Sequence, residues 1–249
     1  GPDEVRKAAR GLIKAGADFL KVVASGGIYG HGEEIGSLQS DLDELSAAVR
    51  EAHKAGKKVA VHVYPEKGIE ICLDAGIDTI EHGSFLTPKL AKRMASQGAC
   101  LVPTLSVFQA MHGRQNEPTT MEFIRRKTAQ VVEASQQAVK IAKANGVKIG
   151  AGTDSGGPWH PHGSIVKEID ALARAGLTPA EALAAATSTN AEILGLEKQI
   201  GSIESGKIAD LIAVAGNPLK DVGALNKIVI VVKNGVPVFS SSGYTEAIS

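Results

Sequence analysis

Hydrophobic and polar positions along the chain form two repeating patterns. Short, mostly apolar runs near residues 21, 61, 80, 102 and 150 are typical of strands that are buried on both faces. Between these runs lie stretches with the spacing of amphipathic helices, and most of them end at a glycine, the residue favoured just after a helix. This alternation of strand, loop and helix predicts an α/β fold with a parallel sheet.

Residue types at the ends of these stretches define the predicted boundaries. Ser40 or Asp41 is suited to cap the start of one helix, and Pro65 is suited to the first turn of another. We expect strands within residues 17–25, 58–63, 77–82, 99–105 and 147–154, and helices within residues 3–15, 40–56, 65–76, 87–98, 120–145, 164–176 and 178–195. A closed eight-stranded barrel needs more strands than these, so the pattern alone fits either an open sheet or part of a barrel.

The pattern changes after about residue 198. Apolar residues then alternate at a period of two, and Asn234-Gly235 is typical of a tight hairpin. Residues 199–240 are therefore predicted to form a small antiparallel β appendage. The expected domains are residues 1–198 for the larger α/β region and residues 199–249 for this appendage.

Composition excludes several classes of partner. Lys plus Arg and Asp plus Glu each number 27, so no global charge favours nucleic acid or an anionic membrane surface. No apolar run approaches the roughly 18 residues of a membrane span. Cys72 and Cys100 lack the spacing of a zinc ribbon or a disulfide framework and are expected to be reduced. We therefore expect a cytoplasmic protein that binds neither nucleic acid nor a membrane.

Polar residues end the predicted strands, where functional groups gather in parallel α/β barrels. They are Lys21, His62, His82, Thr104 and Asp154. Imidazole and carboxylate groups suit a zinc-like metal, so two histidines and an aspartate at one barrel mouth favour a metal site. Each residue also has a simpler interpretation: a histidine of the core, an aspartate that caps a turn, or a lysine whose ammonium reaches the solvent.

Four segments together carry a family resemblance. DFLKV, VAVHVY, TIEHGSF and AGTDSGG, in this order and spacing, resemble the metal-dependent amidohydrolase superfamily. They are most similar to its imidazolonepropionase-related group, which includes prolidase-like peptidases and ochratoxin-hydrolysing amidases. GSIESGKIADLIAV and VKNGVPV resemble the C-terminal part of that family's small β domain. The resemblance implies a (β/α)8 TIM-type barrel, with strands four to eight in this chain, and a β-sandwich-like appendage.

The resemblance also implies a role for each matching residue. Lys21 would be a carboxylated lysine that bridges two zinc ions, and His62 and His82 would bind the second ion. Asp154 would bind the first ion and act as the general base. Tyr64 would contact a substrate carboxylate, and His162 is similar to a recurrent family histidine that lines the pocket.

The sequence departs from the family pattern in one respect. The family has a His-x-His at the end of barrel strand one, whereas His160-Pro161-His162, the His-x-His of this sequence, follows the strand of Asp154. We therefore expect residues 1–249 to be the C-terminal portion of the enzyme, with the N-terminal barrel strands and their His-x-His absent from this chain. The N-terminal portion of the same enzyme would then be a partner, within an expected homo-oligomer.

The relative register of the strands raises a further question. When the glycines of AGADFLK and AGIDTIEH are matched, Lys21 aligns with Glu81. Side chains alternate along a strand, so Lys21 and His82 would then face opposite sides of the sheet. Different strand registers can absorb a difference of one residue, so Lys21 and His82 remain in the expected ligand set.

Three functions remain open from the sequence. The first is a hydrolase of a linear amide bond in a small substrate, such as a dipeptide, an Xaa-Pro dipeptide or an N-acyl amino acid, that uses metal-activated water. The second is a cyclic amidohydrolase of the imidazolonepropionase kind. The third is a catalytically incomplete fragment that needs a second chain.

Overall fold

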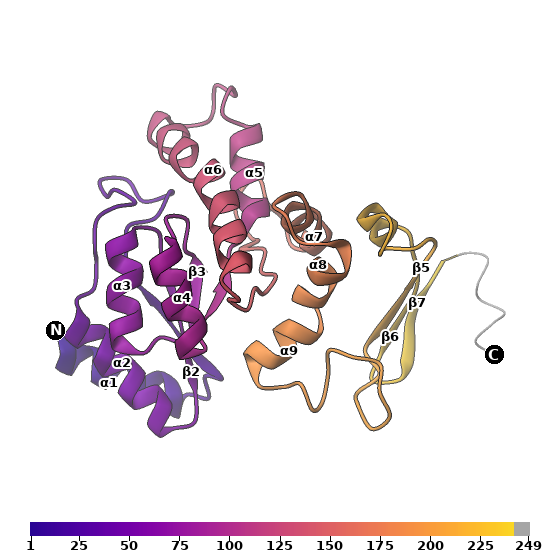
Figure 1. The fold of residues 1–249 in the computed structure, drawn as a ribbon, viewed down its shortest axis with the longest axis horizontal. Helices are drawn as coiled ribbons and strands as arrows, with labels where there is room; N and C mark the ends of the chain where they lie inside the picture. The colour runs from indigo at the N-terminus through magenta and orange to yellow at the C-terminus, as the bar shows by residue number, and fades with distance from the viewer. Residues whose placement is uncertain (242–249) are drawn as a thin grey trace.

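Four parallel strands form the central sheet. In a computed structural model, which describes residues 1–241, consecutive strands are neighbours in the order β1-β2-β3-β4. Their bounds are β1 (Phe19–Val23), β2 (Lys58–Val63), β3 (Thr79–His82) and β4 (Cys100–Val102). Parallel neighbours require crossover connections, and a helix lies in each one. The predicted α/β class is thus confirmed (Figure 1), and within the described residues the strand order leaves the sheet open at β1.

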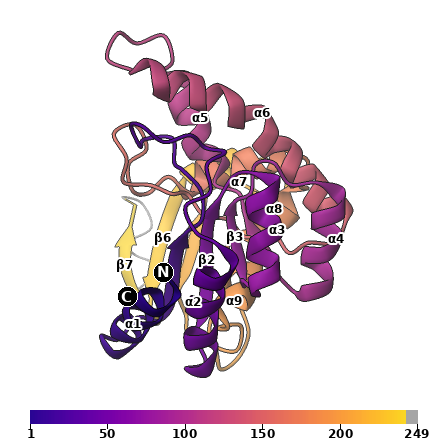
Figure 2. The same cartoon turned by 90° about the vertical axis from the view of Figure 1, so that its left-hand side faces the viewer.

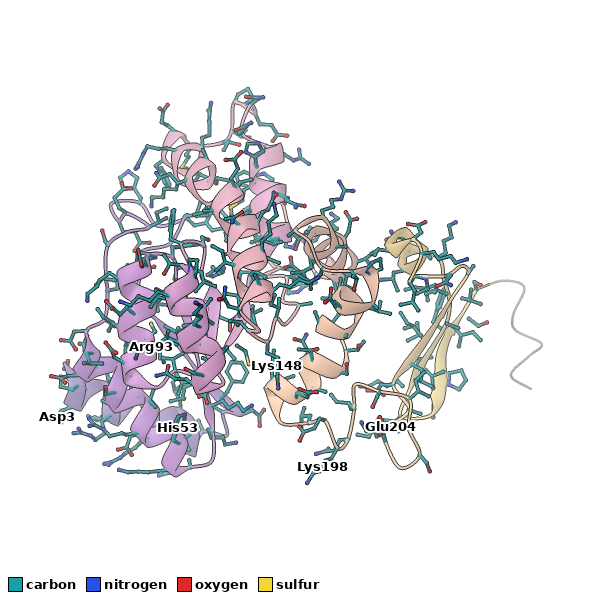
Figure 3. The ribbon with its side chains drawn as sticks, in the orientation of Figure 1. Asp3, His53, Arg93, Lys148, Lys198 and Glu204 are labelled. Atoms are coloured by element: carbon teal, nitrogen blue, oxygen red, sulfur yellow. The ribbon has the colours of Figure 1, made fainter. Side chains whose placement is uncertain are left out.

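The predicted strand near residue 150 is reduced to a single bridge. Leu101 pairs with Ile149 in the parallel sense, so this segment lies next to β4. Gly150 and Gly152 follow, and a Cβ on either glycine would come within 2.5 Å of a neighbouring side chain. The chain therefore passes close to its neighbours here without forming a regular strand. Lys148, labelled in Figure 3, fixes the start of the segment through a 2.7 Å bond to Glu192.

Helices cover one side of the sheet. The first four are α1 (Pro2–Lys14), α2 (Leu42–Lys54), α3 (Glu66–Ala75) and α4 (Pro88–Gln97). Asp41 caps α2 by accepting a 2.9 Å bond from the Glu44 amide, and the Glu44 carboxylate accepts a 3.1 Å bond from the Asp41 amide. α3 and α4 each end at a glycine with positive φ, as expected from the glycine stop signals.

The second half of the α/β region contains five helices: α5 (Leu105–Gly113), α6 (Glu122–Ala144), α7 (Ile165–Arg174), α8 (Pro179–Ala185) and α9 (Ser188–Leu194). Figure 2 shows α5 and α6 beyond the upper ends of β2 and β3. The predicted strand over residues 99–105 was too long, because Thr104 has a φ of 52° and α5 begins immediately after it. The single helix predicted over 178–195 is divided near Thr187 into α8 and α9.

A second sheet follows the helices. It is antiparallel and contains β5 (Leu211–Val214), β6 (Ile228–Lys233) and β7 (Val236–Ser240), with the 3-10 helix η1 (Val222–Asn226) before β6. Asn234 and Gly235 have φ values of 49° and 78°, which suit the predicted tight hairpin between β6 and β7. The predicted antiparallel appendage is present, and residues 242–249 of its expected range lie outside the described residues.

The main core lies between the parallel sheet and its helices. Val59, Val61, Ile80 and Leu101 are fully buried there. Phe19 and Val23, by contrast, lie on the opposite face of β1 and are about half exposed, at 49% and 47%. Burial of one face of the sheet therefore holds this part of the fold together.

Replacing Ile80 by Ala should lower the free energy of unfolding by about 2–5 kcal/mol, because it removes buried methyl groups and leaves a cavity. Urea denaturation measures this change. Leu12→Ala on α1 is the matched control, since Leu12 is 54% exposed and should change stability by about 0.5 kcal/mol or less. Equal losses for the two variants would contradict the assignment of the core.

Candidate active site at the strand ends

The register of the strands brings several predicted site residues to one face of the sheet. Lys21 pairs with Ala60, which pairs with Thr79, and His62 pairs with Glu81. Because faces alternate at every second residue, Lys21, His62 and Glu81 share the face opposite the covering helices. The expectation from the sequence that Lys21 and Glu81 lie on the same face of the sheet is therefore correct.

His82 reaches the same end of the sheet through an unusual backbone conformation. Simple alternation would turn it away from His62, but its φ is 70°. The imidazole rings of His62 and His82 have centroids 4.6 Å apart. Thr104 and Asp154 also have positive φ values, 52° and 50°. Backbone strain of this kind, concentrated at strand ends, is a feature of functional sites.

Hydrogen bonding leaves one nitrogen of each imidazole free of side-chain partners in the described part of the chain. His82 Nδ1 lies 2.7 Å from Thr104 Oγ1, which leaves Nε2 as the available nitrogen. His62 Nε2 is buried, and no residue in 1–241 forms a hydrogen bond with it. Buried polar atoms normally have partners, so an unpaired imidazole nitrogen beside a second imidazole fits a metal ligand.

The environment keeps both imidazoles neutral. Burial lowers the pKa of His62 and of His82, and the positive charge of Lys21 lowers both further. A neutral imidazole has the lone pair that a metal needs. Two imidazoles do not form a complete ligand set, and within residues 1–241 no three His, Cys, Asp or Glu side chains are grouped closely enough to hold an ion.

Tyr64 packs against both histidines. Its ring is stacked on His82 at 5.1 Å and meets the edge of His62 at 4.9 Å. It belongs to a small apolar cluster with Ile28 and Ile35 of the loop after β1. Tyr64 thus packs against this loop and also lines a cavity.

The cavity lies directly beside the His62 imidazole. It has a volume of about 290 Å³ and is lined by Val23, Gly27, Ile28, Tyr29, Gly30, Glu33, His62, Tyr64, Phe108, Met111 and Asp154. Apolar walls with a few polar groups are typical of small-molecule sites. His162 is not among the lining residues; its Nδ1 lies 3.3 Å from Ser155 Oγ, in the loop that follows Asp154.

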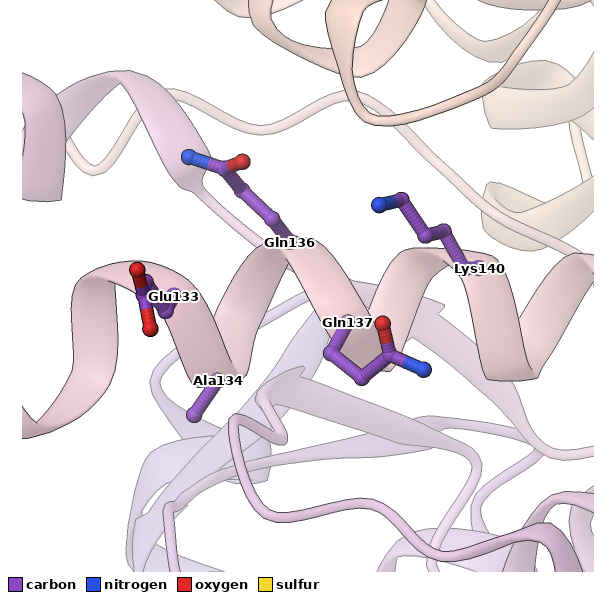
Figure 4. A pocket seen from close by; sticks show the side chains of 5 residues that line it. All are labelled: Glu133, Ala134, Gln136, Gln137 and Lys140. Carbon is purple, nitrogen blue, oxygen red and sulfur yellow. The ribbon is translucent and has the colours of Figure 1, made fainter.

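A second, larger hollow has no comparable chemistry. It measures about 480 Å³ and is lined by Glu133, Ala134, Gln136, Gln137 and Lys140. All five residues belong to α6 (Figure 4). Because a single helix supplies every lining side chain, this hollow brings no groups together from different elements.

The loop after β1 is fastened to α6 at the cavity entrance. Lys127 is 1% exposed, and its ammonium donates to the carbonyl oxygens of Gly27 (3.0 Å) and Gly30 (2.6 Å). Arg126 pairs with Glu34 of the same loop. These bonds hold the loop against α6 and thereby define one wall of the cavity.

A buried carboxylate supports the residues behind His82. Glu168 of α7 is fully buried, and it accepts bonds from the Leu105 amide (2.9 Å) and the Ser106 amide (2.7 Å) at the start of α5. Ser106 Oγ lies 3.2 Å from Nε2 of the buried His160. Burial raises the pKa of the Glu168 carboxyl to about 7, although the two amides and the Ser106 hydroxyl stabilise its charged form. Glu168 thus caps α5 directly after Thr104, the partner of His82.

Several of these residues lack a clear signal in the sequence. Glu168 lies in a helical pattern where a charged residue normally indicates a solvent-exposed face, and Phe108 and Met111 belong to a helix that was not predicted. Glu33 lies within a glycine-rich loop, a kind of segment that gives little information about side-chain direction. Thr104 was noted as a strand-ending residue, but its contact with His82 depends on tertiary structure.

A parallel sheet with polar side chains at the carboxyl ends of its strands is the arrangement of a (β/α)8-barrel enzyme. More particularly, the chain belongs to the amidohydrolase family, which matches residues 1–238. This confirms the resemblance inferred from the sequence motifs and the barrel fold that it implies.

Individual relatives agree with this assignment. Ochratoxinase from Aspergillus niger is 32% identical over 224 residues, which are 89% of this chain and 46% of that protein. The crystal structure of a Xaa-Pro dipeptidase with bound methionine has a TM-score of 0.89 and 34% identity, over 97% of this chain and 59% of that one. A prolidase complexed with N-methylphosphonate-L-proline has a TM-score of 0.88 and 33% identity, over 97% and 59%. The chain spans about half the length of the curated relatives it matches.

No helix within residues 1–241 combines the length and the apolar character needed to cross a membrane.

The buried Glu168 should make stability depend on pH. Its pKa of about 7 in the folded state lies above the ordinary 4.5, so the unfolded chain releases this proton first as pH rises. The contribution of Glu168 to the free energy of unfolding should therefore fall by about 3 kcal/mol between about pH 4.5 and pH 8. Urea denaturation measures the free energy of unfolding of the wild type and of Glu168→Gln across this range. The free energy of the wild type minus that of the variant should decrease by this amount as pH rises.

Glu192→Gln serves as the control for this measurement. Lys148 lowers the pKa of the Glu192 carboxyl, so its contribution to stability should rise with pH instead. A difference between wild type and Glu168→Gln that stays constant with pH would contradict the assignment of Glu168 as a buried acid.

Proposed function

We propose that the assembled protein is a metal-dependent amidohydrolase that cleaves a linear amide or peptide bond of a small substrate, such as a dipeptide, an Xaa-Pro dipeptide or an N-acyl amino acid. The observation that carries this proposal is the pair of imidazoles, His62 and His82, with centroids 4.6 Å apart. His62 lines a cavity together with Tyr64 and Asp154. The relatives named ochratoxinase, Xaa-Pro dipeptidase and prolidase support the same class of reaction.

The proposed metal centre uses residues from separate strands. His62 and His82 would hold one divalent ion, and Asp154 would hold the other. The neutral amine of Lys21 would add to carbon dioxide and release a proton, and the resulting carboxylated lysine would serve as the bridging ligand. Zinc suits this donor set of imidazole and carboxylate oxygens. When bound, the metal supplies Lewis acidity, which polarises the amide carbonyl and acidifies water.

The residues of the chain then position the substrate and move the proton. Asp154 accepts a proton from the attacking water and delivers it to the leaving nitrogen, acting first as a base and then as an acid. The Thr104 hydroxyl fixes the orientation of the His82 ring. Tyr64 forms the wall on which the substrate rests, and its hydroxyl is suited to a substrate carboxylate. His162 lies in the loop after Asp154 and contributes to the entrance of the site.

The described residues supply part of the centre. We assign residues 1–198 to the barrel and residues 199–249 to the small β domain, and propose that a His-x-His from a segment outside these 249 residues completes the ligand set. The exposed side chains of Phe19 and Val23 beside Lys21 are consistent with a further strand that packs on this side of β1. The intact mass of the purified protein under denaturing conditions shows whether such a segment is present.

Hydrolysis by the assembled enzyme tests the proposal. Asp154→Asn should lower kcat for leucyl-proline by about 10²–10⁴-fold, because the variant lacks the group that transfers the proton. Activity should disappear when a chelator removes the metal and return when zinc is added.

Asp170→Asn is the matched control, since Asp170 lies on α7 and pairs with Arg174; its activity should equal that of the wild type. Turnover of cyclic imides without turnover of any linear amide would contradict the proposal.

The hydrogen bond between Thr104 and His82 predicts a separate effect on metal affinity. Thr104→Val keeps the shape of the side chain but removes the hydroxyl, so metal affinity should fall by about 10–100-fold. Competition with a chelating dye measures this affinity directly. Thr104→Ser keeps a hydroxyl and should retain most of the affinity, whereas equal affinity for wild type and Thr104→Val would contradict the role of Thr104 in orienting His82 as a ligand.

A further inference from the structure

Glu33 carries a negative charge on the wall of the cavity. It is the acidic residue that the loop after β1 contributes to the lining, which also includes the apolar side chains of Phe108 and Met111. Its neighbour Glu34 pairs with Arg126 and does not line the cavity. The two adjacent carboxylates of this loop therefore have different surroundings.

The Glu33 carboxylate is fixed in place without being neutralised. Its Oε1 accepts a 3.1 Å bond from the Gly27 amide, and its Oε2 accepts a bond from the Gln39 side-chain amide. Both donors are neutral. No Lys, Arg or His side chain among residues 1–241 forms an ion pair with Glu33, and Lys127 directs its ammonium to backbone carbonyls instead. The charge is thus available to a ligand.

The loop is shaped around this carboxylate. A Cβ on Gly30 would lie 1.6 Å from Glu33 Oε1, so the side chain occupies the space that a larger residue at position 30 would fill. A Cβ on Gly27 would lie 3.7 Å from Glu33 Oε1 and 3.9 Å from His62 Nε2. Glu33 Oε1 and His62 Nε2 therefore both lie within 4 Å of one point beside Gly27, and both side chains line the cavity.

We propose that Glu33 binds the α-ammonium group of the substrate, so that the enzyme acts on dipeptides with a free amino terminus in preference to N-acyl amino acids. This inference rests on the proposed function and narrows its substrate class. In a dipeptide one carbon atom separates the ammonium from the scissile carbonyl, so a carboxylate that lines the same cavity as His62 is suited to hold the ammonium while the carbonyl faces the metal site. The apolar wall of Phe108 and Met111 accommodates an apolar side chain on that carbon.

Two ligands that differ only in this amino group test the proposal. Leucyl-proline has the ammonium, and 4-methylpentanoyl-proline is the same molecule without it. Binding of both to the assembled, metal-depleted protein is measured by calorimetry, so that the result does not depend on turnover. The wild type should bind leucyl-proline about 10–100-fold more tightly than its deamino analogue, the range expected for a hydrogen-bonded charge pair.

Glu33→Gln keeps the size of the side chain and removes its charge, so this preference should fall to about twofold or less. Glu34→Gln is the matched control in the same loop and should keep the wild-type preference. A purely structural role for Glu33 would weaken both ligands equally in Glu33→Gln and leave their ratio unchanged, which would overturn the proposal. Equal affinity of the wild type for the two ligands, or no binding of either, would also overturn it.

Failure of the proposed function gives a different result. An enzyme that binds leucyl-proline with the expected preference but hydrolyses no amide after zinc is restored would retain the role of Glu33 as an ammonium site and contradict the assigned reaction.

Discussion

The site depends on a departure from the alternation of side chains along a strand. A regular strand turns successive residues to opposite faces, and a parallel sheet buried on one face tolerates no slip in this order. Lys21 and His62 obey the rule, whereas His82 reaches the same region through a left-handed backbone conformation. Thr104 and Asp154 use the same conformation at the next two strand positions. Such residues cost about 1–3 kcal/mol each, so the packing of the sheet must hold them in place.

That packing comes from the layer behind the strands. The buried carboxylate of Glu168 bonds to the first amides of α5 and fixes the chain just after Thr104, whose hydroxyl meets His82. The orientation of the His82 ring therefore depends on Thr104 at a strand end, and the position of Thr104 depends in turn on Glu168 of the outer helix α7. Desolvation has two effects in this arrangement. It keeps the imidazoles neutral, and it favours the protonated form of Glu168.

Much of the α/β region could be predicted from local sequence. The apolar runs of β1 to β4, the cap at Asp41 and the glycine stops are local signals, and the structure follows them. The family motifs identified four site candidates for the same reason, since each motif lies in or next to a short apolar run. The start of α5 could not be predicted, because its cap comes from Glu168, 63 residues away from Leu105. The roles of Glu33 and Thr104 likewise depend on which atoms surround them in space, and these tertiary contacts cannot be predicted from the sequence pattern.

The buried ammonium of Lys127 has a consequence for how the site is entered. Its two acceptors are backbone carbonyls of the loop after β1, while the lysine itself belongs to the long helix α6. Moving the loop alone would leave a positive charge buried without its acceptors, which is far more costly than moving loop and helix together. Loop and helix should therefore behave as one rigid unit. Any widening of the entrance would then involve the whole of that unit swinging away from the barrel, with the substrate admitted along its edge.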